Sequence, residues 1–229
     1  MNDDVRSLTI DEWVVRWRPP LDGQAPQPVL MLLHGWKGDE NVMWIFASRL
    51  PSDALIIAPR AIYATPDGGF GWHLQRGETP FRVEDFSPAV EALLAFLPEL
   101  QGRIEAEMAP VTPSGQLFDF SSINWLGFSQ GAALVYTLAL LHPERVGKLG
   151  GLAGFMPEGA DSLAASQPLK GKQAFVAHGS EDETVPIELA RHAVETLENA
   201  GAHVTFCEDA VGHKLSLTCF RSLDSFFKS

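Results

Sequence analysis

The chain has 229 residues, of which 45% are hydrophobic and 20% are charged, a balance that is typical of globular proteins. Its formal net charge is -12, with 29 acidic residues against 17 lysines and arginines. Because so acidic a chain offers no basic face to neutralise phosphates, the composition argues against binding to nucleic acid or to anionic lipid. The length suits one domain with a sizeable core, so we expect a single domain over residues 1–229.

The apolar runs of the chain predict neither a targeting segment nor a membrane span. Residues 1–4 lack both the basic region and the apolar core of a signal peptide. The longest apolar-rich run, residues 132–141, is half the roughly 20 residues that a helix needs to cross a bilayer. We therefore predict a cytoplasmic protein with no stable membrane insertion.

Cys207 and Cys219 are the only two cysteines. Two cysteines in a chain of this size do not form a disulfide framework. Cys207 falls in an apolar strand pattern, which favours a small core residue over a reactive thiol.

Short apolar runs alternate with helical patterns along the chain. Residues 5–18 alternate apolar and polar positions and predict an edge hairpin. The continuous apolar runs at residues 29–33 and 54–59 predict strands that are buried on both faces, with a helical pattern between them. This alternation predicts an α/β fold, in which a mostly parallel central sheet carries helices on both faces.

The middle of the chain contains two long segments rich in turn-forming residues. Residues 60–84 and 109–121 are both predicted to be loops. Between them, we interpret Ser87 as a helix N-cap followed by Pro88 at the first helical position, and Pro98 as a kink or break in that helix.

The second half of the chain continues the alternation of strands and helices. Strands are predicted at residues 123–128, 148–155, 173–177 and 204–207, and helices at residues 132–142, 186–200 and 215–227.

The stretch Gly127-Phe128-Ser129-Gln130-Gly131 joins a predicted strand to a predicted helix. A serine held on so sharp a turn projects its Oγ clear of the sheet. We expect glycine at positions 127 and 131 because the turn packs backbone against backbone, where a Cβ would clash. The first N–H groups of the helix point back at the turn and favour a developing negative charge beside Ser129. We predict that Ser129 is a nucleophile.

A serine hydroxyl needs a base within hydrogen-bond reach. On a parallel sheet that base lies after the carboxyl end of a strand, at the edge where Ser129 lies. Among the seven histidines, His213 comes just after the last predicted strand and before the final helix, so we predict that it is the base. His178 also follows a strand, but glycine and a turn come directly after it.

The base in turn needs an acid that holds it in the correct tautomer. Asp182 lies in the loop after the strand at residues 173–177 and gives the chain order Ser, Asp, His. We predict Asp182 as the acid, with Glu158 and Asp161, after the preceding strand, as the alternative.

An oxyanion hole would take one N–H from Gln130, the residue after the nucleophile. The second N–H is expected from the loop after the first buried strand, His34-Gly35-Trp36, and Trp36 is the predicted donor. The alternative interpretation of His34-Gly35 is a plain tight turn.

Several motifs together resemble the phospholipase/carboxylesterase family of α/β-hydrolases, which includes acyl-protein thioesterases and small bacterial carboxylesterases. The motifs are His34-Gly35, Gly127-Phe128-Ser129-Gln130-Gly131-Ala132-Ala133, His178-Gly179-x-x-Asp182-x-x-Val185-Pro186 and Gly212-His213. The resemblance extends from about residue 28 to residue 227 and implies an α/β-hydrolase fold over the whole chain. It also implies a Ser129, Asp182 and His213 triad, with Trp36 and Gln130 as the oxyanion donors.

The chain departs from the family pattern at three places. His73 and Leu74 follow Trp72 where the family often has an aromatic residue and Asp, Ala153-Gly154 replaces the common Ser-Gly, and segment 109–121 is longer than usual. These changes bear on the acyl-chain specificity and leave the predicted chemistry intact.

The sequence therefore predicts a serine hydrolase that cleaves carboxylic ester or thioester bonds of small or acyl substrates through an acyl-enzyme. Trp36, Trp72, Phe155 and Met156 are expected to line an apolar acyl site, the alternative being ordinary aromatic packing. No metal or organic cofactor is expected, because the metal-ligand and phosphate-loop spacings are missing from the sequence.

Two other functions are weighed against this one. One is a hydrolase fold that binds without turnover, and the other is a hydrolase of another bond, a peptidase or a dienelactone-type enzyme. Position 129 is serine, whereas dienelactone-type hydrolases usually have a cysteine nucleophile. Homodimer formation is left open.

Overall fold

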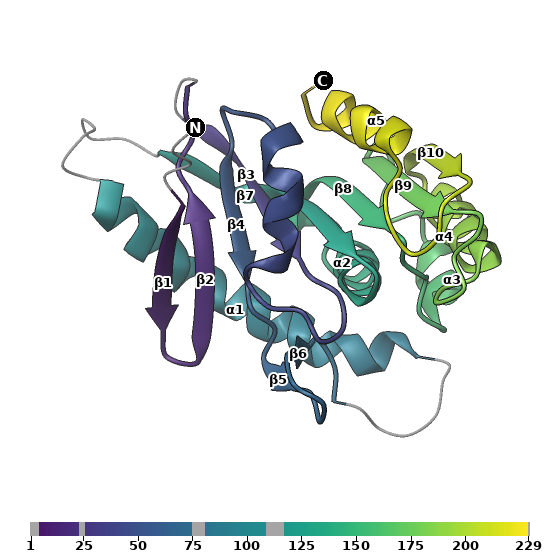
Figure 1. Ribbon diagram of the computed structural model, residues 1–229, viewed down its shortest axis with the longest axis horizontal. Helices are drawn as coiled ribbons and strands as arrows, with labels where there is room; N and C mark the ends of the chain where they lie inside the picture. The colour runs from purple at the N-terminus through teal and green to yellow at the C-terminus, as the bar shows by residue number, and fades with distance from the viewer. Residues whose placement is uncertain (1–4, 23–25, 75–80, 109–116, 229) are drawn as a thin grey trace.

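An eight-stranded sheet forms the centre of the computed structural model, which describes residues 5–22, 26–74, 81–108 and 117–228. The strand order is β1-β2-β4-β3-β7-β8-β9-β10 (Figure 1). The strands are β1 (Arg6–Ile10), β2 (Trp13–Arg18), β3 (Gln27–Leu33), β4 (Leu55–Pro59), β7 (Phe118–Phe128), β8 (Val146–Leu152), β9 (Gln173–Gly179) and β10 (His203–Asp209). From β4 to β10 every neighbouring pair is parallel, and the β1–β2 hairpin adds on antiparallel to β4. The mostly parallel sheet and the edge hairpin are as predicted.

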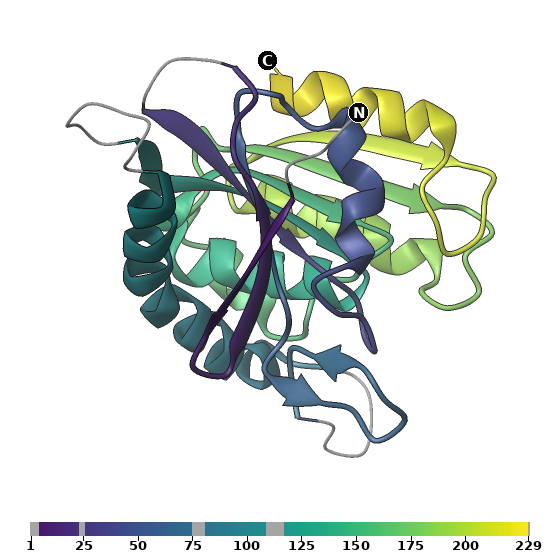
Figure 2. The same ribbon diagram turned by 60° about the vertical axis from the view of Figure 1, so that its left-hand side comes forward.

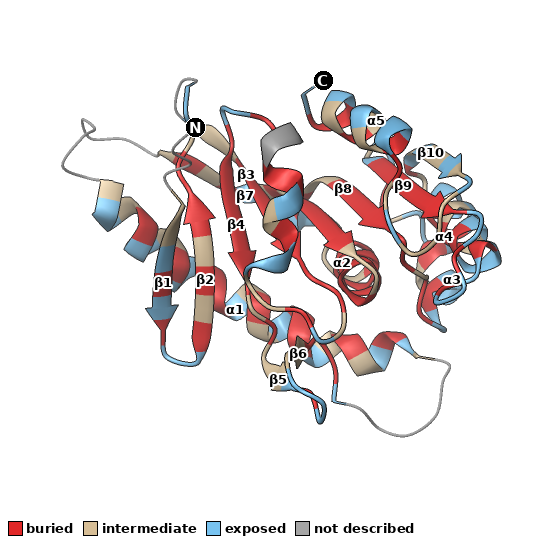
Figure 3. Ribbon diagram, in the orientation of Figure 1, coloured by how far each residue is buried: buried red, intermediate tan, exposed pale blue. Residues whose placement is uncertain are grey.

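Helices cover both faces of the sheet, and the alternation of side chains along β3 shows why. Leu30 and Leu32 pack into one core with 3-10 helix η1 (Val42–Arg49) and α5 (Leu217–Lys228). Met31 and Leu33 pack into the other core with α1 (Val83–Met108), α2 (Gln130–Leu141), α3 (Ala160–Ala164) and α4 (Ile187–Asn199). Figure 2 shows η1 and α5 on one side of the sheet and α1 on the other, and the central strands are buried almost throughout in Figure 3. The predicted fold class is confirmed.

Residues 60–74 contain a small second sheet in a segment that was predicted to be a loop. Here β5 (Tyr63–Ala64) pairs antiparallel with β6 (Phe70–Gly71). The hairpin packs on the turn after β3, because the Phe70 N–H donates to the carbonyl of Gly38 at 3.0 Å. Residues 75–80 of the predicted loop lie outside the described residues.

Helix α1 begins earlier than predicted and contains both prolines. The Ser87 hydroxyl is not an N-cap, because it donates to the carbonyl of Val83 within the helix at 2.9 Å. Asp85 accepts the N–H of Arg82 at 2.8 Å and so supplies a cap to the start of the helix. Helical structure continues through Pro88 and Pro98 to Met108, since the apolar face of α1 stays buried along its length.

Strand β7 also begins earlier than predicted, at Phe118, so the end of the predicted loop 109–121 is strand. Residues 109–116 of that loop lie outside the described residues. Among the helices of the described residues, none combines the length and the apolar character that a bilayer crossing needs.

Candidate active site

Four segments meet at one edge of the sheet because they follow the carboxyl ends of parallel strands. Trp36 follows β3, Ser129 follows β7, Asp182 follows β9 and His213 follows β10. Since β3, β7, β8, β9 and β10 are all parallel, residues that are far apart in the sequence share this edge (Figure 1).

Ser129 connects β7 directly to α2 in a backbone conformation that only a tightly packed turn sustains. Its φ is 52° and its ψ is -117°, a combination that non-glycine residues rarely adopt. A Cβ on Gly127 would lie 2.2 Å from the Gly131 carbonyl oxygen, and a Cβ on Gly131 would lie 2.1 Å from the Leu33 carbonyl oxygen. Both predicted clashes are therefore found, and the turn needs both glycines. Ser129 as a residue is only partly buried.

Asp182 and His213 are in direct contact. His213 Nδ1 lies 2.7 Å from Asp182 Oδ2, and the Asp182 side chain is fully buried whereas that of His213 is 24% exposed. The other carboxylate oxygen, Oδ1, accepts the N–H groups of Thr184 and Val185, each at 2.9 Å. Because a carboxylate only accepts, the hydrogen of this contact is on Nδ1, and in the neutral tautomer Nε2 is then an acceptor.

Opposing effects act on the pKa of Asp182. Burial raises the pKa of this carboxyl, but the N–H of Val185, the His213 side chain and the N–H of Thr184 together outweigh burial and lower it. The group is therefore a carboxylate at neutral pH. Asp161, the alternative acid, contacts His192 at 3.2 Å and Thr196 at 2.8 Å instead of His213.

The His213 ring lies beside the nucleophile turn. Its centroid is 5.1 Å from that of Phe128, the residue that precedes Ser129. Within the described residues the Ser129 hydroxyl and His213 form no hydrogen bond. Catalytic hydrogen bonds are often long or poorly aligned without substrate and tighten when it binds. The sequence prediction of all three residues at one edge agrees with this arrangement.

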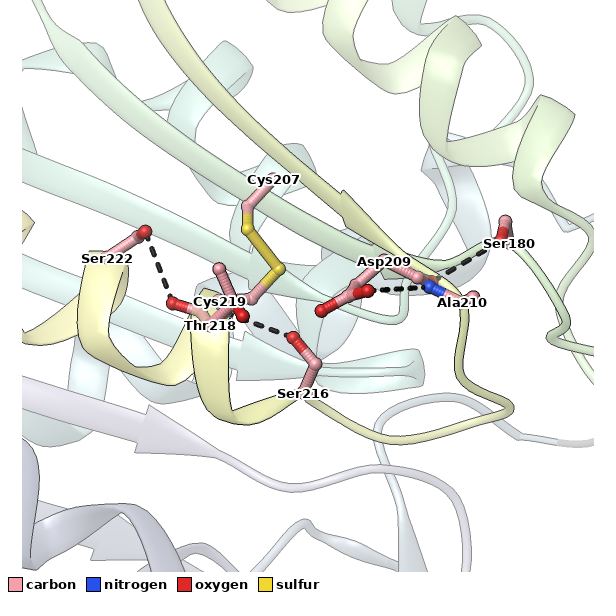
Figure 4. Close-up of a disulfide and its surroundings, with 8 residues drawn as sticks. All are labelled: Ser180, Cys207, Asp209, Ala210, Ser216, Thr218, Cys219 and Ser222. Carbon is pink, nitrogen blue, oxygen red and sulfur yellow. Dashed lines mark hydrogen bonds between the residues drawn. A yellow bond between two sulfur atoms is a disulfide. The ribbon is translucent and has the colours of Figure 1, made fainter.

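A disulfide brackets the segment that carries His213 (Figure 4). Cys207 on β10 is bonded to Cys219 on α5, 12 positions apart. The prediction that Cys207 is a small core residue is therefore wrong: the residue is only half-buried and is paired, because the return of α5 over β10 brings the two Cα atoms to 5.6 Å. Backbone contacts add to the tether: the N–H of Glu181 donates to the carbonyl of Val211 at 3.1 Å.

The predicted oxyanion donors belong to two segments next to Ser129. Gln130 is the first residue of α2, and its N–H is one of those that a helix leaves without an intrahelical partner. A Cβ on Gly35 would lie 3.2 Å from the Ser129 Cβ, so the backbone that leads into Trp36 passes directly beside the nucleophile.

Trp72 holds these two segments together. Its backbone N–H donates to Gln130 Oε1 at 2.8 Å, and its indole N–H donates to the carbonyl of His34 at 2.8 Å. The Trp72 side chain is fully buried at 0% exposure, so in this structure it supports the site from behind and presents no surface to a substrate.

His34 is a further support at the base of this loop. Its Nε2 accepts the N–H of Ala61 at 3.0 Å, while Nδ1 lies 2.7 Å from the carbonyl of Gly35. Burial lowers the pKa of His34 despite opposing effects from Gly35, Asp39 and Glu40. The histidine is therefore neutral and braces the turn that leads to Trp36.

A row of aromatic rings extends away from Trp36. Trp36 stacks on His73 at 5.3 Å between ring centroids, His73 lies 4.6 Å from Phe81, and Phe81 stacks on Phe155 at 5.6 Å. Phe86 on α1 packs edge-on against this row, with its ring centroid 5.4 Å from that of His73. Of these rings, Trp36 and Phe155 were predicted to line the acyl site, and His73 was noted only as a departure from the family pattern. Phe81 and Phe86 were missed because they belong to none of the recognised motifs.

The two remaining predicted substrate residues follow β8. Phe155 is half-buried, whereas Met156 is 6% exposed. A Cβ on Gly154 would lie 3.1 Å from the Ser129 carbonyl oxygen, so this segment starts next to the nucleophile turn. Within the described residues, no group of three or more His, Cys, Asp or Glu side chains is arranged to hold a metal ion.

The parallel sheet with helices on both faces, together with a strained serine between a strand and a buried helix, defines an α/β-hydrolase fold. A family model described as phospholipase/carboxylesterase matches residues 21–229. The chain belongs to the phospholipase/carboxylesterase family, as the motifs predicted.

Solved structures agree on the fold. A carboxylesterase of Bacillus cereus superposes with a TM-score of 0.78 at 23% identity, covering 99% of this chain and 95% of that chain. A carboxylesterase of Mesorhizobium loti gives a TM-score of 0.76 at 23% identity, with 99% of each chain covered.

Among curated proteins, a probable carboxylesterase of Oryza sativa subsp. japonica is 28% identical over 139 residues, which are 60% of this chain and 50% of the rice protein. A second rice protein, named a probable inactive carboxylesterase, is 30% identical over 128 residues, 55% of this chain and 49% of that protein. The chain thus matches about half the length of these curated relatives.

Proposed function

We propose that this protein is a single-domain serine hydrolase that cleaves carboxylic ester or thioester bonds of small or acyl substrates through an acyl-enzyme. The observation that carries the proposal is the 2.7 Å contact between Asp182 and His213, at the sheet edge where a strained turn presents Ser129. Membership of the phospholipase/carboxylesterase family and the carboxylesterase names of the similar proteins support the same reaction.

In the first half of the proposed reaction, Ser129 Oγ attacks the carbonyl carbon of the substrate while His213 Nε2 takes the hydroxyl proton. Asp182 keeps the other ring nitrogen protonated and stabilises the imidazolium that forms. The proton then passes to the leaving alcohol or thiol as its bond to the acyl carbon breaks, and the acyl group stays on Ser129. In the second half, His213 takes a proton from water as the water oxygen attacks the acyl carbon. The bond between the acyl carbon and Ser129 Oγ then breaks, His213 returns the proton to Oγ, and the carboxylic acid is released.

The N–H groups of Trp36 and Gln130 are proposed as the oxyanion hole. Two observations support this assignment: Gly35 lies close to Ser129, and the N–H of Gln130, at the start of α2, has no partner within the helix. The negative charge exists only on the tetrahedral intermediate, so these donors lower the barrier rather than strengthen substrate binding. Loss of one such donor typically raises the barrier by about 3–4 kcal/mol.

Phe155 and Met156 are proposed to line the acyl site, together with the aromatic row that starts at Trp36. Trp72, which was predicted to line it too, is better explained as the support of both oxyanion donors, because its side chain has no exposed surface. The proposed substrate is a small molecule, and homodimer formation is left open.

The cytoplasmic location also stays a prediction, and one structural feature argues against it. Disulfides persist in oxidising compartments and are rare in the cytosol, where thiols are kept reduced. The Cys207–Cys219 disulfide therefore favours an oxidising environment for this chain.

Labelling with a fluorophosphonate, which reacts with activated serines, tests the proposal. We expect one adduct on Ser129, which should be lost in Ser129→Ala. It should be retained in the control Ser166→Ala, which changes an exposed serine outside the motifs of the predicted site. Hydrolysis of p-nitrophenyl acetate should follow the labelling. Correctly folded protein with no adduct and no turnover would instead support a binding protein with a hydrolase fold.

A series of oxygen esters and thioesters of increasing acyl length then identifies the bond and the chain length. A ratio of kcat/KM that favours thioesters at every length would narrow the reaction to acyl-thioester cleavage. Hydrolysis of peptides in preference to both series would contradict the proposed substrate class.

A further inference from the structure

His178 lies behind the carboxylate of Asp182, and no step of the proposed reaction uses it. It is the next-to-last residue of β9, and its side chain has no exposed surface. Its Nε2 lies 2.8 Å from the carbonyl oxygen of Val185 and 3.4 Å from Asp182 Oδ2, the same oxygen that His213 contacts. We propose that His178 is a positioning residue that holds the Asp182 carboxylate in the orientation that His213 requires, an inference that rests on the proposed function.

The protonation of the ring follows from its partners. A carbonyl oxygen only accepts hydrogen bonds, so the hydrogen of the contact with Val185 is on His178 Nε2. That N–H lies between two oxygen atoms, the Val185 carbonyl and Asp182 Oδ2, and is attracted to both. The other nitrogen, Nδ1, is buried and has no hydrogen-bond partner within the described protein.

Val185 passes the effect of His178 to the catalytic carboxylate. Its carbonyl accepts from His178, and its N–H donates to Asp182 Oδ1 at 2.9 Å. Both polar groups of this buried residue are thus engaged, one on each side of the turn at residues 182–185. A continuous chain of contacts runs from His178 through Val185 and Asp182 to His213.

An apolar side chain would fill the same space but would break this chain at its first contact. The buried carbonyl of Val185 would lose its donor, and a buried acceptor without a partner is unfavourable enough to drive the turn to rearrange. Rotation of the turn moves Asp182 Oδ1 with it, since both its donors belong to the turn. Oδ2 then leaves the position that fixes the His213 tautomer.

Two substitutions of similar length separate a donor from mere bulk. In His178→Gln the amide nitrogen is able to take the place of Nε2 and donate, whereas His178→Met has no donor. We expect His178→Met to lower kcat for p-nitrophenyl acetate about tenfold or more with little change in KM, because a hydrogen bond near a charged group is lost. His178→Gln should restore most of the rate at a similar melting temperature.

The inference and the proposed function fail in different ways. A wild type that labels at Ser129 and turns over, with His178→Met and His178→Gln equally active, overturns the role of His178 alone. A wild type that is neither labelled nor active overturns both. In an Asp182→Asn background His178→Met should cause no further loss of kcat, and an additive loss would show that it does not act through Asp182.

A measurement on the unaltered protein covers the case in which both variants misfold. Nitrogen NMR of histidine-labelled protein reports which ring nitrogen carries the hydrogen. We expect the hydrogen of His178 on Nε2, with slow exchange because the ring is buried. A hydrogen on Nδ1 alone would leave Nε2 unable to donate, which contradicts the proposal.

Discussion

Ser129 and His213 reach the same edge of the sheet by different means. Ser129 is fixed locally, between the end of β7 and the start of α2, by glycines that let the backbone pack within van der Waals contact. His213 lies in the middle of a loop between β10 and α5, and what holds it comes from elsewhere in the chain. Its supports are the Asp182 carboxylate, the backbone after β9 and the Cys207–Cys219 disulfide.

The two halves of the site are therefore sensitive to substitution in different ways. The nucleophile turn is a single packed unit, because residues 130–140 of α2 are buried along their whole length. The loop that carries His213 is held by several separate contacts. Removing these contacts one at a time should therefore displace His213 by increasing amounts. Substitutions at those contacts should therefore produce a graded series of rates with Ser129 still in place.

The largest step is expected from Asp182→Asn. The amide has nearly the shape of the carboxylate and retains an oxygen for the turn, but it no longer fixes the hydrogen on His213 Nδ1. The wrong tautomer in such a triad lowers kcat by about 10⁴. Steady-state kinetics on p-nitrophenyl acetate measures the loss, and Asp161→Asn, which alters the alternative acid, is the matched control.

A loss of less than about tenfold in Asp182→Asn would mean that another group orients His213. An equal loss of kcat in Asp161→Asn would indicate that Asp161 is the catalytic acid, contrary to the observed contact between Asp182 and His213.

A smaller step is expected from Gly179→Ala, at the end of β9. A Cβ at this position would lie 2.0 Å from the carbonyl oxygen of Val211 and 2.4 Å from that of Gly212. The clash pushes the segment that leads into His213 away from the sheet edge, and a displacement of about 1 Å in a catalytic group costs on the order of a hundredfold in rate. Rates of fluorophosphonate labelling and of ester hydrolysis should fall together. A rate equal to that of the wild type would show that the loop adjusts without moving the base.

The disulfide should contribute more to stability than to rate. Replacing both Cys207 and Cys219 by alanine frees a closed loop of 12 positions, for which chain entropy gives a loss of about 3 kcal/mol in the free energy of unfolding. We expect only a small fall in kcat, because Asp182 and the backbone contacts still hold His213. Urea denaturation measures the first effect. Reductant should reproduce it in the wild type and change nothing in the double variant, and two free thiols in the native protein would contradict the bridge.

The sequence was most informative where position along the chain decides position in space. Ser129 follows from its motif, because the strand, the turn and the helix are adjacent in the sequence. Asp182 and His213 follow from a rule of topology, since residues after the ends of parallel strands share one edge. The fold class and the family follow from the same alternation and motifs.

Features that depend on contacts between distant segments were out of reach. The pairing of Cys207 with Cys219 requires the path of α5 over β10, which no local pattern contains. His178 was passed over although it shares a family motif with Val185, because the motif does not show that the ring contacts the Val185 carbonyl across the turn. The start of α1 was misplaced because Ser87 and Pro88 give a local cap signal that the buried helix face overrides.

The smallest effect is expected from Gly102→Ala, which tests whether a glycine is needed because an added Cβ would clash or because the backbone must be flexible. Gly102 lies inside α1, and a Cβ there would meet nothing within 4 Å. Gly102→Ala removes the entropy penalty of a helical glycine, so we expect a gain of about 1 kcal/mol in stability and a melting temperature higher by about 2–4 °C. The kcat should not change. Both variants replace glycine by alanine. A lower rate in Gly179→Ala, together with a higher stability and unchanged kcat in Gly102→Ala, would show that the effect depends on what the added methyl group contacts. A destabilised Gly102→Ala would contradict that explanation.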